Sequence, residues 1–237
     1  MQVGTRRPLV IAHRGASRDA PENTLAAFRL ALTQRADMIE TDLHLTRDGR
    51  IVLVHDAELG GSDVTRLARA EVRERAPQVP TLEEALDAVG GRILFNLEIK
   101  PRDDEDYDAV VDVALRAVRR RGLQGEVLWS SFAPKALETL REREQTARLG
   151  VLVAASEPVA RPEPVAGALA LARALGAEAV HPHLPLVTSE IVTALHAAAL
   201  AVHVFTVDEL ADMQRLVGLG VEGIFTNFPA RLRGLLG

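Results

Sequence analysis

Residues 8–45 read PLVIAHRGASRDAPENTLAAFRLALTQRADMIETDLHL and contain a complete strand–helix–strand pattern. The apolar run at 8–12 predicts a first strand and the run at 38–45 a second. Between them, the spacing of Leu25, Phe28 and Leu32 predicts a helix over about 24–34, with Asn23 as its N-cap. Two strands joined by a helix are the unit of a parallel sheet.

The same alternation continues to the end of the chain. Counting the run at 51–54 as an extension of the second strand gives eight strands, each followed by a helical pattern. The later strands are expected at 92–99, 126–132, 148–153, 178–181, 201–207 and 222–226. A doubly wound open sheet alternates in the same way, but the strand count and the length favour an α/β (β/α)8 TIM barrel. No linker interrupts the pattern, so residues 1–237 are expected to form a single domain.

Composition excludes several classes of protein. The 237 residues include no cysteine, which excludes a disulfide scaffold, a thiolate zinc site and a cysteine nucleophile. A net charge of −5 does not favour nucleic acid as a partner. No apolar run approaches the roughly 20 residues that a membrane span requires. We expect a soluble, cytoplasmic protein with no nucleic-acid partner and no membrane span.

Ionisable residues gather at the expected C-terminal ends of the early strands, where barrel enzymes carry their functional groups. Glu40 and Asp42 lie two residues apart in a strand and therefore face the same side. Glu98, on the third strand, is expected at the same mouth. Three converging carboxylates repel one another, and a hard divalent cation such as Mg²⁺ or Ca²⁺ relieves that repulsion. A metal-free network with Arg14 and Lys100 is the alternative, but two cations leave three carboxylates one charge short.

Two histidines and two cations complete the set of candidates. His13 and His55 can exchange protons near neutral pH. Arg14 and Lys100 supply the positive charge that a phosphoryl group requires. A carboxylate-bound cation with these four residues describes phosphodiester chemistry.

The motifs that carry these residues also indicate a family. They are HRGASRDAPENT at 13–24, ETD at 40–42, HD at 55–56, NLEIK at 96–100 and GIFTNFP at 223–229. In this order they resemble the glycerophosphodiester phosphodiesterase family, over residues 11–229. The resemblance implies a barrel with a small hairpin insertion after strand 2, over about 44–80, above the barrel mouth.

The resemblance also implies an activity and the roles of the residues. Glycerophosphodiesters such as glycerophosphocholine or glycerophosphoethanolamine would be hydrolysed to sn-glycerol 3-phosphate and an alcohol. Glu40, Asp42 and Glu98 would hold one divalent cation, and His13 and His55 would form the acid–base pair. Arg14 and Lys100 would bind the phosphate. The nucleophile is water or the glycerol 2-hydroxyl.

The chain departs from the family pattern in three places. Phe205-Thr-Val-Asp208 stands where WTVN is usual, Thr226-Asn227 where TD is usual, and the stretch after Asp56 is short. These differences bear on substrate selectivity and not on the reaction class. Phe205 is a candidate for the pocket wall.

Phe132 is a further candidate for the pocket wall, and the His181–His183 pair is expected at the rim and not on a metal.

One alternative function is a phosphodiesterase acting on lysophospholipids or another phosphodiester. A second is a non-catalytic barrel that binds phosphate esters. The expected partner is a small molecule, and a homo-oligomer is possible.

Overall fold

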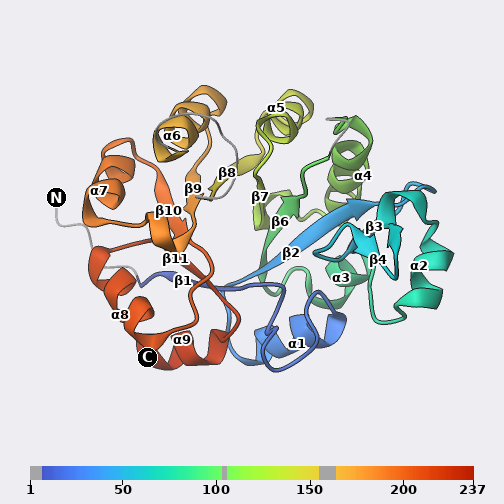
Figure 1. Cartoon of the computed structure of the whole chain (residues 1–237), viewed down its shortest axis with the longest axis horizontal. Helices are drawn as coiled ribbons and strands as arrows, with labels where there is room; N and C mark the ends of the chain where they lie inside the picture. Colours follow the sequence, from blue (N-terminus) through green and yellow to red (C-terminus); the bar gives the residue numbers. More distant parts are fainter. Residues whose placement is uncertain (1–6, 103–105, 155–163) are drawn as a thin grey trace.

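The computed structural model describes residues 7–102, 106–154 and 164–237, and its centre is a closed barrel of parallel strands (Figure 1). The sheet runs in the order β1-β11-β10-β9-β8-β7-β6-β2, and β1 also pairs with β2, which closes the barrel. The eight barrel strands are β1 (Leu9–Ala12), β2 (Met38–Leu45), β6 (Leu94–Ile99), β7 (Val127–Ser131), β8 (Arg148–Val153), β9 (Ala179–Pro182), β10 (Ala201–Val204) and β11 (Gly223–Thr226). The prediction of a (β/α)8 TIM barrel is confirmed.

A helix follows each barrel strand, and Figure 1 shows these helices as a ring outside the strands. They are α1 (Leu25–Thr33), α3 (Leu82–Val89), α4 (Asp108–Arg119), α5 (Pro134–Arg143), α6 (Pro164–Leu175), α7 (Ser189–Ala197), α8 (Leu210–Leu219) and α9 (Pro229–Leu236). Gly220 ends α8 in the left-handed conformation, with a φ of 77°, as its position in the sequence predicts.

The start of α1 differs from the prediction. Its N-cap is Thr24, whose side-chain oxygen accepts a hydrogen bond from the backbone N–H of Ala27. Asn23 is therefore wrong as the N-cap. Asn23 has a φ of 54°, and its side-chain amide donates to Asp42 Oδ2 at 2.8 Å. Both residues are good capping types, and the sequence alone did not show that one of them is needed elsewhere.

Residues 44–80 contain several short elements between β2 and α3. Strand β2 is followed by the antiparallel β3 (Ile51–Leu53), and the Arg47-Asp48-Gly49-Arg50 segment forms the turn of this hairpin. The elements that follow are β4 (Glu58–Leu59), β5 (Ser62–Asp63), the 3₁₀ helix η1 (Val64–Arg66) and α2 (Arg69–Arg75). The segment has a small apolar cluster of its own, made of Val52, Val64, Leu67, Val72, Ala76 and Val79. In Figure 1 these elements extend beyond β2, on the right of the view.

The barrel interior changes from apolar to polar along the strands. An inner cluster of Ile11, Met38, Leu128 and Phe225 is almost completely buried. Two and four residues beyond Met38, towards the C-terminal end of β2, come Glu40 and Asp42. Because alternate residues of a strand share a face, the carboxylates follow the apolar interior on the same side of β2.

Candidate active site

One cavity of about 210 Å³ brings together eight of the nine residues that the sequence proposes for the site. Those eight are His13, Arg14, Glu40, His55, Glu98, Lys100, Phe132 and Phe205. Asp42, the ninth, does not line the cavity but lies beside Glu40 and Glu98 in a cluster of carboxylates. Residues as far apart in the chain as His13 and Phe205 therefore meet in one place.

The acidic cluster is built by two neighbouring strands. Glu40 and Asp42 are on β2, and Asp42 is paired in register with Glu98 on β6. All three side chains are buried, and one oxygen from each lies within 4.8 Å of the others. Burying three carboxylates so close together is unfavourable unless positive charge compensates them.

Burial and nearby charges give the three carboxyl groups different pKa values. Burial, together with the negative charge of Asp42, raises the pKa of Glu98 to about 7 and that of Glu40 well above its ordinary value. Burial acts in the same direction on Asp42, but two cations outweigh it and hold the pKa of Asp42 below its ordinary value. Those cations are Lys100 and Arg14.

Lys100 and Arg14 contact the cluster directly. Lys100 Nζ lies 2.8 Å from Glu98 Oε1 and 3.2 Å from Asp42 Oδ1. Arg14 donates its backbone N–H to Glu40 Oε2 at 2.8 Å, and its Nε lies 3.5 Å from Asp42 Oδ2. The two cations are thus held at the edge of the cavity by the same carboxylates.

The turn that carries Arg14 requires glycine at the next position. Gly15 has a φ of 81°, and a Cβ there would lie 2.8 Å from the backbone of Ala27 in α1. A larger residue would therefore push the turn away from the helix. The close approach keeps His13 and Arg14 at the end of β1.

The residues present fit a hard divalent cation. Glu40 Oε1 is buried and has no hydrogen-bond partner among the described residues. The cluster offers only carboxylate oxygens, which Mg²⁺ and Ca²⁺ prefer, and Arg14 and Lys100 leave three carboxylates one charge short. The metal-free alternative leaves the buried Glu40 oxygen unpaired, so the cluster is better explained as one that could hold a metal ion.

The two candidate histidines are held by different partners. His13 Nδ1 lies 2.8 Å from Asn227 Oδ1, and its Nε2 is 4.0 Å from Glu40 Oε2. Burial, and then the charge of Arg14, lower the pKa of His13. His55 follows β3, and its Nδ1 lies 2.8 Å from Asp56 Oδ1. In both rings Nδ1 is hydrogen-bonded to a neighbouring side chain, and this bond fixes the orientation of the ring.

Aromatic rings also line the cavity and contact one another. Phe132 and Phe205 meet edge to face with ring centroids 5.8 Å apart, and the ring of His183 stacks on Phe205 at 5.4 Å. Five further residues line the cavity and were not among the nine proposed site residues, namely Asn96, Leu152, His183, Thr206 and Phe225. Asn96 had a usable signal, because it lies two residues before Glu98 in the same strand.

The His181–His183 pair does not act as a unit. His181 Nε2 lies 3.2 Å from Nδ1 of His203 in the fully buried interior, whereas His183 lines the cavity. Among the described residues, the group of side chains that could hold a metal ion is Glu40, Asp42 and Glu98. The expected position at the rim is wrong for His181, whose side chain is completely buried in β9.

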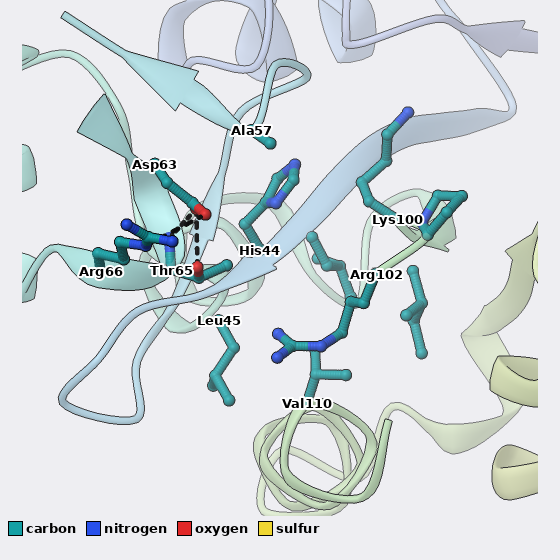
Figure 2. A pocket seen from close by; sticks show the side chains of 12 residues that line it. His44, Leu45, Ala57, Asp63, Thr65, Arg66, Lys100, Arg102 and Val110 are labelled. Carbon is teal, nitrogen blue, oxygen red and sulfur yellow. Dashed lines mark hydrogen bonds and ion pairs between the residues drawn. The ribbon is translucent and has the colours of Figure 1, made fainter. Parts of the chain in front are cut away.

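A second cavity of about 360 Å³ lies between the 44–80 segment and the end of β6 (Figure 2). Asp63 and Arg66 line it from one side, and Lys100 and Arg102 from the other. Figure 2 shows the His44 ring between these two groups. Lys100 lines both cavities, so the second one adjoins the candidate active site.

The chain is similar to known proteins over nearly its whole length. The family model described as the glycerophosphoryl diester phosphodiesterase family matches residues 13–231. A glycerophosphodiester phosphodiesterase of Caldanaerobacter subterraneus subsp. tengcongensis is 30% identical, over 97% of this chain and 98% of that protein. One from Bacillus altitudinis is 31% identical, over 94% of this chain and 95% of its own length.

Solved structures are similar over the same length. An Oleispira antarctica phosphodiesterase in complex with the product sn-glycerol-3-phosphate has a TM-score of 0.86 and 26% identity, with 97% of each chain covered. The chain belongs to the glycerophosphoryl diester phosphodiesterase family and is an enzyme, a phosphoric diester hydrolase. The resemblance found in its motifs is confirmed.

Among the described residues, none of the helices has the length and apolar character needed to cross a membrane.

Proposed function

We propose that this enzyme hydrolyses glycerophosphodiesters, such as glycerophosphocholine or glycerophosphoethanolamine, to sn-glycerol 3-phosphate and an alcohol. The observation that carries the proposal is the shared cavity, in which His13 and His55 flank a carboxylate cluster bordered by Arg14 and Lys100. The solved relative that contains sn-glycerol-3-phosphate supports the same product.

The roles of the residues follow from this arrangement. We propose that Glu40, Asp42 and Glu98 hold one Mg²⁺ or Ca²⁺. Such a cation would neutralise charge that develops on the phosphate in the transition state. Lys100 and Arg14 would attract the anionic phosphate to the same place and orient it.

Proton transfer is assigned to the histidines. One imidazole would accept the proton of the nucleophile, and the other would donate a proton to the departing alkoxide. Among the described residues, Nε2 of neither ring has a hydrogen-bond partner, whereas Nδ1 lies 2.8 Å from Asn227 Oδ1 in His13 and 2.8 Å from Asp56 Oδ1 in His55. Phe132 and Phe205 would exclude water from the aromatic side of the cavity.

The alcohol part of the substrate is assigned to the 44–80 segment. This segment supplies His55 to the first cavity and Asp63 and Arg66 to the second. Because Lys100 lines both, a diester held at Lys100 could extend its alcohol into the second cavity. We propose that the segment selects among alcohols there.

The test is an assay that detects released glycerol 3-phosphate. Glycerophosphocholine, glycerophosphoethanolamine and a lysophospholipid are each supplied with Mg²⁺, with Ca²⁺ or with EDTA. Release from the first two that requires a cation supports the proposal. A lysophospholipid would yield an acylated glycerol phosphate and not glycerol 3-phosphate, so its cleavage is detected by the released alcohol. Cleavage of the lysophospholipid alone would favour that second substrate class. A cytoplasmic location and a homo-oligomer remain predictions.

A further inference from the structure

A chain of hydrogen bonds leads from the candidate site to an acidic residue behind it. His13 Nδ1 lies 2.8 Å from Asn227 Oδ1, directly after β11. Asn227 donates its side-chain Nδ2 to Asp208 Oδ2 at 2.7 Å and its backbone N–H to Asp208 Oδ1 at 2.9 Å. Asp208 lies between β10 and α8, and no role in catalysis has so far been assigned to it.

The chemistry of each group sets the direction of these bonds. A carboxylate only accepts hydrogen bonds, so the Asn227 NH₂ group must face Asp208. The Thr226 hydroxyl also donates to Asp208 Oδ1, at 3.1 Å, because its own oxygen already accepts from the backbone N–H of Phe228. Three donors therefore converge on the Asp208 carboxylate.

The carbonyl oxygen of Asn227 must then face the other way. It accepts from the hydroxyl of Ser17 at 2.8 Å, and the same oxygen faces His13 Nδ1. An amide oxygen has no proton to donate, so His13 Nδ1 must carry the hydrogen. A neutral His13 therefore has an unprotonated Nε2, and this atom is on the side of the ring nearer Glu40 and the cavity.

We propose that Asn227 and Asp208 are positioning residues for His13. Asp208 fixes the orientation of the Asn227 amide, and that amide fixes the His13 ring in the tautomer whose Nε2 can accept a proton in the cavity. The catalytic part of this inference rests on the proposed function, because it takes His13 as one of the acid–base pair.

The side chains of Asp208 and Asn227 should tolerate exchange only when both positions are changed at once. In N227D two carboxylates would face each other at the place of a 2.7 Å hydrogen bond. In D208N the new side chain keeps one acceptor oxygen. Its NH₂ group would face either the side-chain NH₂ group of Asn227 or the two other donors, the Asn227 backbone N–H and the Thr226 hydroxyl. Each single variant loses the unique orientation of residue 227.

The double variant D208N/N227D is expected to restore each of these hydrogen bonds, and residue 227 would still present an acceptor to His13. The NH₂ group introduced at 208 would donate to the carboxylate introduced at 227, and its oxygen would accept from the backbone N–H and from Thr226. The carboxylate at 227 would still accept from His13 and Ser17. A residue that matters only for bulk or local packing would not show this reciprocal pattern.

The experiment compares wild type with the two single variants and the double variant, with Mg²⁺ and a glycerophosphodiester that wild type cleaves. Each single variant is expected to lower kcat by about 10- to 100-fold with KM little changed. The double variant is expected to recover most of the loss. Thermal unfolding of each variant checks that it is folded. Full activity in both single variants, or a double variant that loses as much as the two singles combined, would overturn the proposal.

A second measurement does not depend on catalytic activity. Nitrogen chemical shifts of labelled histidine at pH 8 report which ring nitrogen carries the hydrogen, and the His13 signal is assigned by its absence in H13Q. Wild type is expected to show hydrogen on Nδ1, and D208N a mixture of tautomers. Hydrogen on Nε2 in wild type would overturn the inference. If wild type shows hydrogen on Nδ1 but cleaves no glycerophosphodiester, the proposed substrate class fails and the positioning of His13 stands.

Discussion

Asp42 on β2 and Glu98 on β6 are paired in register across neighbouring parallel strands, and the Lys100 ammonium group contacts both carboxylates. Glu40 completes a buried cluster that one lysine and one arginine do not neutralise. Charge that is buried without full compensation lowers stability. Such a cluster is expected where a bound cation supplies the missing charge.

Replacement of Glu98 by glutamine is expected to weaken cation binding. The variant removes one of three anionic ligands, so activity should require on the order of 100-fold more Mg²⁺. Mg²⁺ should also raise the Tm of wild type more than that of E98Q. The control is E178Q, which removes an ion pair with Arg148 near the N-terminal ends of β8 and β9. An unchanged dependence on Mg²⁺ in E98Q would remove Glu98 from the metal site.

Removal of either histidine of the cavity is expected to slow the reaction. H13Q and H55Q should each lower kcat by about 10²–10⁴-fold, because each loses one proton-transfer group. The matched control is H196Q, which changes a histidine on α7 that is paired with Glu222 and lines neither cavity. Steady-state kinetics of the three variants make the comparison. Full activity in both H13Q and H55Q would disprove the acid–base assignment.

Replacement of Glu40 by glutamine is expected to stabilise the metal-free protein while it abolishes activity. Glutamine keeps an oxygen for the Arg14 backbone N–H and removes a charge that burial and Asp42 both disfavour. The expected gain in EDTA at pH 8 is about 1–3 kcal/mol, which corresponds to a rise in Tm of several degrees. Differential scanning calorimetry measures it. A lower Tm in EDTA would show that the charge of Glu40 is well compensated without metal.

The buried pair His181–His203 is expected to make the fold sensitive to acid. Burial lowers the pKa of His203 to about 4 and that of His181 well below its ordinary value. An unfolded histidine has a pKa of about 6.5. Between pH 6.5 and 4 the unfolded chain takes up protons that the folded chain does not, so stability falls as the pH falls. For His203 alone the loss at pH 5 is about 2 kcal/mol.

Urea unfolding at pH 7.5 and pH 5 tests this effect. H203Q is expected to lose less free energy of unfolding between the two pH values than wild type does. H196Q serves as the surface control. Its loss of unfolding free energy between pH 7.5 and pH 5 should stay closer to that of wild type. An equal loss in wild type and H203Q would show that His203 does not cause the acid sensitivity.

Much of the fold could be read from local patterns. The βα alternation predicts the barrel because each amphipathic helix must cover a strand, and the C-terminal ends of parallel strands must meet. That second constraint also places Glu40 and Glu98 at one mouth without any knowledge of their contacts. The boundaries of the elements were less accurate, and Asn23 was assigned to the helix although its side chain binds Asp42.

Other relationships appeared only in the tertiary structure. The sequence shows Asp208 and Asn227 as two separate departures from a family pattern. In the fold they are hydrogen-bonded to each other, and Asn227 also faces His13. The His181–His183 motif likewise divides, since His181 pairs with His203 while His183 lines the cavity.

The sequence by itself determined the family, the barrel and the residue types at the strand ends, because periodicity and motif order are local properties of the chain. The tertiary structure decided which of those residues touch. Contacts such as Asp208–Asn227 and Asp42–Glu98 depend on the register and closure of strands that are far apart in sequence. Register is set by the packing of the whole sheet and not by the residues of any one strand.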